Sequence, residues 1–168
     1  GPVPDSGSNV CIPQDVGTPR ISTPVTVATV LVGLEGHAGH AWLQVGDLPT
    51  GAGSPRAIHP VTGNSRVVAG STLKLASSSR CAGGTDSEVA VTGAGSLTNV
   101  GVIESVTCAS GSTDPPSDDL FSGCFGGGRT LSGSILNFGE ILATERLAYN
   151  GGGTLFSQGK LRALAQSD

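Results

Sequence analysis

Three histidines are the side chains of this sequence with the most obvious capacity for chemistry. His37 and His40 lie three residues apart among glycines, His59 follows in a proline-rich stretch, and Asp47 is close in sequence. Three imidazole nitrogens and a carboxylate could together hold zinc. A spacing of three residues is typical of helical metal motifs, however, whereas this stretch is a turn broken by glycines. The pattern therefore favours histidines exposed in loops.

The chain contains no pattern typical of a catalytic nucleophile. Gly70-Ser71, Gly95-Ser96 and Gly133-Ser134 are ordinary turn dipeptides, because no Gly-x-Ser-x-Gly elbow stands at a strand-to-helix junction. The glycine run 126–129 lacks the Lys-Ser/Thr pair of a phosphate-binding loop. We predict no catalytic residues and no intrinsic hydrolase activity. We also expect that replacing the three histidines together by alanine leaves the melting temperature within a few degrees.

The composition indicates a protein of short β-strands. Among 168 residues, 27 glycines and 10 prolines make long helices improbable. The hydrophobic fraction of 37% contains few aromatics and no Met, so burial must come from many short segments of Val, Leu, Ile and Ala. A single domain of this length can bury a core.

The charge excludes one class of partner, and the hydrophobic pattern excludes another. With a net charge of −4 and nine scattered Lys and Arg residues, the chain lacks the basic surface that nucleic acids require. No apolar run approaches the roughly 18 to 20 residues that cross a bilayer, so membrane insertion is not expected. Gly1-Pro2 resembles the remnant of a removed tag, which favours a mature secreted protein. We therefore expect a secreted, extracellular location.

Four cysteines predict a disulfide framework. Cys11, Cys81, Cys108 and Cys124 have none of the C-x-x-C spacing of zinc or redox sites, and they stand in Gly/Ser/Thr-rich surroundings. Such surroundings are typical of extracellular domains, in which cysteines are oxidised. We predict two disulfides, and the sequence alone leaves three pairings open.

The segment 21–48 is the most regular part of the chain. Val25 and Val27 alternate on one face, and Val30, Val32 and Leu34 continue one residue out of phase, as in a strand with a bulge near residues 28–29. A second strand at 41–45 is predicted to pair back on the first, which starts a β-meander. Trp42 lies opposite Leu43 and Val45 in this alternation. We expect it to be a partly buried structural anchor.

Gly and Pro residues divide the rest of the chain into short segments. The pattern predicts a flexible leader over 1–15 and surface loops over 49–60 and 109–119. It also predicts a hairpin or strand pair around Gly70, a hairpin at Asn150-Gly151 and a final strand over 158–164. Residues 16–168 are then a single all-β domain, a β-sandwich or jelly-roll of short antiparallel strands.

A weak internal repeat favours a different architecture. The segments GSLTNVGVIESVT and SGSILNFGEILAT share an N-x-G-x-I core at a spacing of roughly forty residues. Such units resemble the coils of right-handed β-helix adhesins. Two copies are few for a solenoid, so the β-helix is our alternative prediction.

Several segments, read in order, resemble the P-domain that follows the catalytic domain of proprotein convertases and many bacterial exoproteases. HAWLQVGDL at 40–48 is similar to the family's His-Thr-Trp-Val-Gly-Asp-Leu segment. The segments 81–86 and 103–108 are similar to its paired cysteine elements, and 135–140 fits its Leu-x-x-Phe-x-Gly-Glu. The closing hairpin survives in part at 151–155, without its tryptophan and with glycine in place of its aspartate.

The resemblance implies a β-sandwich, a disulfide between Cys81 and Cys108, and an accessory role. Because the family's calcium sites use acidic turns, Asp47, Asp86 and Glu88 are possible calcium ligands, although solvated turn acids are the simpler interpretation. No other cofactor is expected.

Two functions follow as hypotheses. The first is a non-catalytic P-domain-like module that stabilises the catalytic domain of a parent protease or assists its substrate binding. The second is a stand-alone adhesive or structural module that contacts an extracellular protein, a glycan surface or a neighbouring copy.

Overall fold

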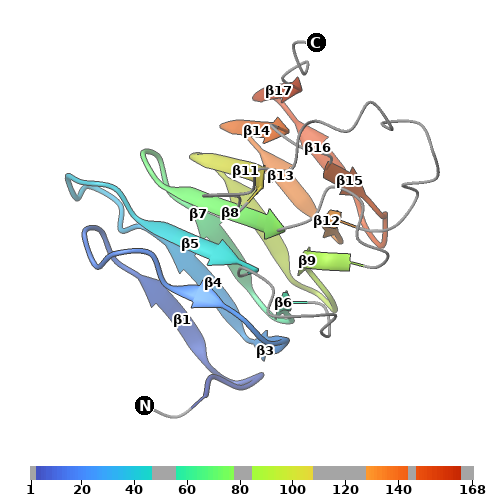
Figure 1. The fold of residues 1–168 in the computed structure, drawn as a ribbon, viewed down its shortest axis with the longest axis horizontal. Coiled ribbons are helices and arrows are strands. Elements are labelled where there is room, and N and C mark those ends of the chain that lie inside the picture. Colours follow the sequence, from blue (N-terminus) through green and yellow to red (C-terminus); the bar gives the residue numbers. More distant parts are fainter. Residues whose placement is uncertain (1–2, 47–55, 78–84, 108–127, 144–146, 164–168) are drawn as a thin grey trace, which may run out of the picture.

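The computed structural model describes residues 3–46, 56–77, 85–107, 128–143 and 147–163. These residues form 17 β-strands and no helix, and the strands belong to three sheets (Figure 1). Sheet A contains β1 (Asn9–Ile12), β4 (Thr29–Val32), β7 (Asn64–Val67), β10 (Ser96–Asn99), β13 (Ile135–Asn137) and β16 (Leu155–Ser157). Sheet B contains β2 (Arg20–Ile21), β5 (Trp42–Val45), β8 (Thr72–Ser77), β11 (Val102–Thr107), β14 (Glu140–Ala143) and β17 (Lys160–Ala163). Sheet C contains β3 (Val25–Val27), β6 (Arg56–Pro60), β9 (Thr85–Ala90), β12 (Gly128–Ser132) and β15 (Leu147–Tyr149).

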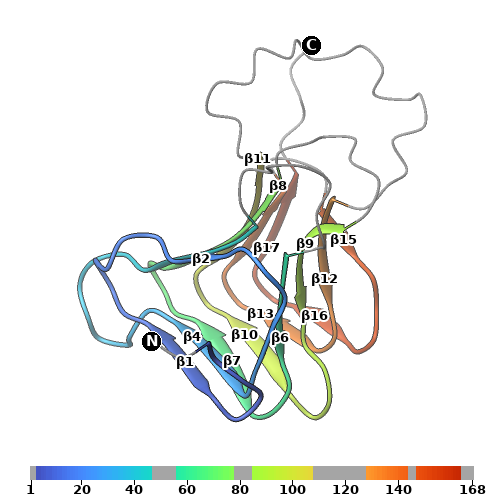
Figure 2. The ribbon, with the colours of Figure 1, turned by 60° about the horizontal axis from the view of Figure 1, so that its bottom comes forward.

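The chain visits the sheets in a fixed cycle. Each strand of sheet A is followed by one of sheet B and, in the first five turns, by one of sheet C, so one turn of the chain forms one coil. Every pair of neighbouring strands is parallel. Figure 2 shows the three sheets around one interior, with β1 and β17 at opposite ends of the stack in Figure 1. This is the arrangement of a parallel β-helix.

The predicted antiparallel sandwich or jelly-roll is therefore wrong. The predicted β-meander fails with it, because β5 pairs with β2 and β8 rather than with β4. An alternating pattern reports which side chains face the core, but a strand that pairs in parallel alternates in the same way as one that pairs antiparallel. The coiled architecture that the repeat predicted is the one observed.

The repeated N-x-G motif forms the corner between sheets A and B. Asn99 and Asn137 end successive strands of sheet A, occupy equivalent positions in the register and are fully buried. The Asn99 Nδ2 donates to the Asn137 Oδ1 (2.7 Å) and to the Glu140 carbonyl (2.9 Å). The Asn137 Nδ2 donates in the same way to the Ser157 hydroxyl (2.9 Å) and the Lys160 carbonyl (3.2 Å). Each amide thus satisfies a backbone carbonyl of the next coil, which the tight corner would otherwise leave unpaired.

This amide ladder starts at Asn99. Val67 occupies the equivalent position of the preceding coil, so it offers no donor. Consistent with this, the buried Asn99 Oδ1 has no hydrogen-bond partner within the described residues. The corner between β7 and β8 also contains four residues, 68–71, where the later corners contain two.

The glycine of the motif allows neighbouring coils to approach closely. A Cβ on Gly101, Gly139 or Gly159 would overlap a backbone carbonyl oxygen of the preceding coil. None of the three has a positive φ, so the requirement for glycine here is steric rather than conformational. The asparagine and the glycine of the repeat therefore serve the same purpose, which is to stack one corner on another.

The interior consists of columns of side chains that run from coil to coil. In sheet B, one column contains Leu43, Leu73, Ile103, Ile141 and Leu161 in register. The first three are fully buried, Ile141 is 7% exposed and Leu161, at the last coil, is 59% exposed. In sheet C, Ile58, Val89 and Leu131 form a second buried column. The alternation therefore predicted the core-facing residues correctly.

Several local predictions change in a coiled fold. The bulge expected near Ala28 is the corner at which the chain passes from sheet C to sheet A. The turns at Gly70 and Asn150-Gly151 join strands of different sheets, so neither forms a hairpin. The left-handed conformations of Gly151 and Gly152 turn the chain from β15 towards sheet A.

Two predicted boundaries also differ. The predicted loop over 49–60 contains β6 in its second half, because a strand that ends at Pro60 loses no ladder donor before its last residue. The predicted leader over 1–15 contains β1, which pairs with β4 and belongs to the first coil. The predicted final strand is present as β17. The predicted loop over 109–119 lies outside the described residues.

Candidate binding surface on sheet B

The outer face of sheet B carries two straight rows of side chains. The core column of this sheet alternates with positions that point outwards, and the parallel register aligns these positions from coil to coil. One row contains Trp42, Thr72, Val102, Glu140 and Lys160. The other contains Arg20, Gln44, Lys74, Glu104, Leu142 and Arg162. This face is therefore largely polar and of mixed charge.

Trp42 is the large aromatic side chain of this face. It is 37% exposed, whereas its neighbours in β5, Leu43 and Val45, are fully buried. Thr72 is its register partner in the next coil. Trp42 therefore lies outside the core, as its alternation with Leu43 indicates, and the surrounding side chains cover the buried part of its surface.

Two side chains contact the Trp42 indole. The imidazole of His40 lies 4.5 Å from the indole, centroid to centroid, and its Nε2 forms a 2.9 Å hydrogen bond with the Thr72 hydroxyl. The Lys74 ammonium lies over the indole, 5.4 Å from the ring centroid, in a cation–π contact. We call His40, Trp42, Thr72 and Lys74 the Trp42 patch.

Hydrogen bonds join the backbone under the patch to both neighbouring coils. The His40 carbonyl accepts from the Asp15 amide (3.1 Å), and the Ala41 carbonyl accepts from the Thr72 amide (2.9 Å). The Gln44 side chain donates to the Gly46 carbonyl (3.1 Å). A surface whose backbone is fixed in this way loses little backbone conformational entropy when it binds a ligand.

The predicted histidine site is not assembled. His37 is exposed in the turn before β5, His40 belongs to the Trp42 patch, and His59 lies in sheet C. No group of three or more potential metal ligands occurs within the part of the chain that the structure describes. His40 and His59 are only half-exposed, and the His59 Nε2 lies 3.8 Å from the Glu88 carboxylate. The predicted loop position therefore holds for His37 and His40 but not for His59, and full exposure holds for His37 alone.

The possible calcium ligands and the cysteines are described only in part. Asp86 and Glu88 belong to β9, and Asp47 lies outside the described residues. Cys11 is exposed on β1 and forms no disulfide with another described residue. Cys81, Cys108 and Cys124 lie outside the described residues, so the two-disulfide framework and the Cys81–Cys108 bridge stay predictions.

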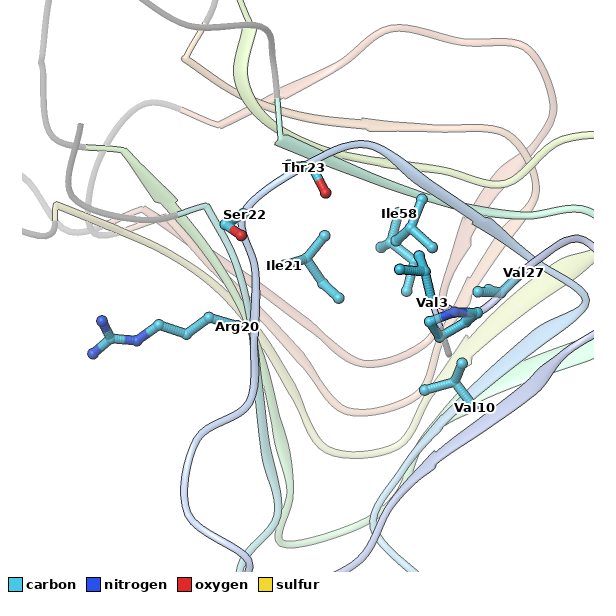
Figure 3. A pocket seen from close by; sticks show the side chains of 10 residues that line it. Val3, Val10, Arg20, Ile21, Ser22, Thr23, Val27 and Ile58 are labelled. Carbon is cyan, nitrogen blue, oxygen red and sulfur yellow. The ribbon is translucent and has the colours of Figure 1, made fainter. Parts of the chain in front are cut away.

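Hollows at the two ends of the stack are openings of the core. One of about 140 Å³ is lined by residues of the first coils, among them Val10, Val27 and Ile58. Figure 3 shows these side chains facing the hollow, while Arg20 points away from it to the outer side of sheet B. The other, of about 310 Å³, is lined by residues of the last coils, including Leu155 and Leu161. Their walls are largely apolar, so they offer few groups that could act on a substrate.

Fold and surface together define a repetitive β-helical module with a fixed aromatic patch on one outer face. Comparison with protein-family models, with curated proteins and with solved structures found no match. Across the described ranges, no helix is long and apolar enough to span a membrane.

Sequence reasoning found Trp42 but not its neighbours. The alternation set Trp42 opposite Leu43 and Val45, and we expected a partly buried structural anchor; the side chain is 37% exposed on the outer face. Thr72 and Lys74 follow it by about thirty residues and join it only through the coil-to-coil register. The signal that could have found them was a third copy of the repeat, TLFSQGKL at 154–161, in which Ser157 replaces the asparagine. Three copies would have favoured the coiled fold and its register.

Proposed function

We propose that this protein is a non-catalytic adhesive module of an extracellular surface, in which the β-helix presents the Trp42 patch to a ligand. The observation that carries the proposal is the exposure of the single tryptophan on the outer face of sheet B, in contact with His40 and Lys74. Tryptophan is enriched among the residues that dominate binding energy. A fixed aromatic side chain outside the core is thus better explained by recognition than by stability.

The stacked coils suit this role mechanically. Each coil adds one strand to each sheet, so the outer face extends along the stack as a flat surface with a regular spacing of side chains. Extended concave or flat surfaces of this kind are how repeat proteins bind large partners. The secreted location remains part of the proposal.

The P-domain resemblance no longer supports the accessory role, because the β-sandwich that it implied is not the fold of this chain. A role beside a catalytic domain of a parent protease would need support from another source. The adhesive role does not depend on that resemblance.

Retention of protein-coated beads on cell layers tests the proposal. We expect beads that carry the protein to be retained on bacterial or epithelial cells above beads that carry an inert protein. Trp42→Ala should reduce this retention at least tenfold, because truncation of a central aromatic contact typically costs more than about 1.4 kcal/mol of binding.

Phe138→Ala is the matched control. Phe138 is 48% exposed, lies three coils away from Trp42 and contacts Phe156. Its replacement should leave retention unchanged. Equal retention of the protein and of Trp42→Ala, with both variants folded by circular dichroism, would contradict the proposal, as would the absence of any retention.

A further inference from the structure

The surroundings of Trp42 are rich in hydrogen-bond donors. Lys74 stands beside it, and Arg20 is two positions further along the same row, beyond Gln44. The Asp15 carboxylate lies beside Gly39, and Glu104 is the register partner of Lys74 in the next coil. Lys74 is therefore the cationic group in contact with the Trp42 ring, within surroundings of mixed charge.

Lys74 keeps its charge available for a ligand. Within the described residues its ammonium forms no ion pair, and its interaction is the contact with the Trp42 ring. A cation–π contact at an exposed site is worth little, so the ammonium can leave the ring at low cost. By contrast, His40 is fixed by its bond to Thr72.

The patch has one apolar surface with a polar rim. The indole is surrounded by an imidazole, a hydroxyl, an amide and an ammonium, which belong to His40, Thr72, Gln44 and Lys74. The core of a protein–protein interface needs a wider apolar area than one indole. Nucleic acids need a continuous run of positive charge, which the acids at Glu104 and Glu140 interrupt.

A ring that is apolar on one face and polar at its edge fits this patch. Sugars have this shape, because their C–H groups gather on one face and their hydroxyl groups lie around the rim. An indole face carries negative partial charge, which attracts C–H groups. A carboxylate on the sugar would complement the charge of Lys74.

We propose that the Trp42 patch binds a carboxylated sugar residue of a surface glycan, and this inference rests on the proposed adhesive function. The sugar ring lies against the exposed part of the Trp42 indole. The Lys74 ammonium moves from the ring to the sugar carboxylate and forms an ion pair. Gln44 borders the patch next to the hydroxyl groups, whereas Thr72 is only 5% exposed and holds His40.

Titration of the tryptophan fluorescence tests the inference, because Trp42 is the single tryptophan of the chain. The probes are a hyaluronan tetrasaccharide, which carries glucuronate, and a chitin tetrasaccharide, which lacks a carboxylate. We expect the acidic probe to bind up to about fivefold more tightly at low salt, as a surface ion pair allows, and the preference to fall as salt is added.

Two variants, Lys74→Gln and Trp42→Ala, show which side chains contribute to binding, and Lys160→Gln is the control. Lys74→Gln should remove the preference for the acidic probe and leave the weaker binding of the neutral one. Lys160→Gln, which removes an exposed lysine from the same sheet three coils further on, should change neither. Trp42→Ala, followed by calorimetry, should weaken both probes at least tenfold.

The inference fails if neither probe binds, if both bind equally well, or if Lys160→Gln has the effect expected of Lys74→Gln. These failures differ from a failure of the adhesive function. If Trp42-dependent retention on cells is unchanged after glycosidases have removed the carboxylated sugars from the cell surface, the patch binds another ligand, and the sugar is excluded while the adhesive function holds. If retention is independent of Trp42, the adhesive function itself is wrong.

Discussion

Gly139→Ala is expected to lower the free energy of unfolding by about 3 kcal/mol, at the upper end of the usual cost of overpacking. The new Cβ would overlap the Gly101 carbonyl oxygen and lie 2.7 Å from the carbonyl carbon of Val100. Both are backbone atoms of the preceding coil, so relief requires the coils to separate. Because the φ of Gly139 suits any residue, the loss would reflect contact alone.

Urea denaturation followed by circular dichroism measures this loss. Gly7→Ala is the matched control, since its Cβ would meet the Asp5 carboxylate at an ordinary distance of 3.5 Å. We expect the control to change stability by less than about 0.5 kcal/mol. A Gly139→Ala protein as stable as the Gly7→Ala protein would refute the close stacking of the corners.

Leu73→Ala is expected to lower the free energy of unfolding by roughly 3 to 4 kcal/mol. Leu73 is fully buried and lies between Leu43 and Ile103 in the core column of sheet B. Its truncation leaves a cavity that the neighbouring coils cannot close. The lost transfer free energy and the free-energy cost of the cavity therefore add together.

Leu161→Ala provides the comparison within the same column. Leu161 is 59% exposed at the last coil, so its truncation should cost less than about 1 kcal/mol. The shift of the urea midpoint gives both values when the slope of the transition is unchanged. Similar losses for Leu73→Ala and Leu161→Ala would contradict the order of the column.

The sequence predicted the elements of this fold better than their pairing. Leu43 and Val45 were set on one face of their strand, and both are fully buried, because alternation depends only on which face of a strand is buried. Whether two strands pair in parallel depends on the path of the chain between them, and short polar corners carry few signals of that path. Asn150-Gly151 is a typical hairpin dipeptide, yet it also suits a corner between sheets, since both need left-handed glycine.

The binding surface was predictable only in its centre. The alternation in β5 set Trp42 on the face opposite Leu43, although we expected it there as a structural anchor and not as part of a binding surface. Thr72 and Lys74 become its neighbours because β8 pairs with β5 in parallel, which a β-meander does not allow. The N-x-G repeat indicated a coiled fold, and its spacing of 38 residues gives the register of Asn99 and Asn137, but β4 and β7 lack the motif, so it did not give the register of β5 and β8.

Disulfide trapping tests the stacked parallel register most directly, and the outer face of sheet B depends on that register. Thr98 and Leu136 are register partners on the outer side of sheet A, whereas Phe156 lies one strand further on. Neighbouring strands lie about 4.8 Å apart, within the range that a disulfide spans, and a separation of two strands, roughly 10 Å, exceeds it.

We therefore expect the double variant Thr98→Cys/Leu136→Cys to form the new bridge on mild oxidation, and Thr98→Cys/Phe156→Cys to remain unbridged. Mass spectrometry of the cross-linked peptides distinguishes this bridge from those of the native cysteines. The parallel β-helix predicts a cross-linked peptide that joins positions 98 and 136 in the first variant, and none that joins positions 98 and 156 in the second. The absence of the first peptide, or equal yields of both, would contradict the parallel β-helix.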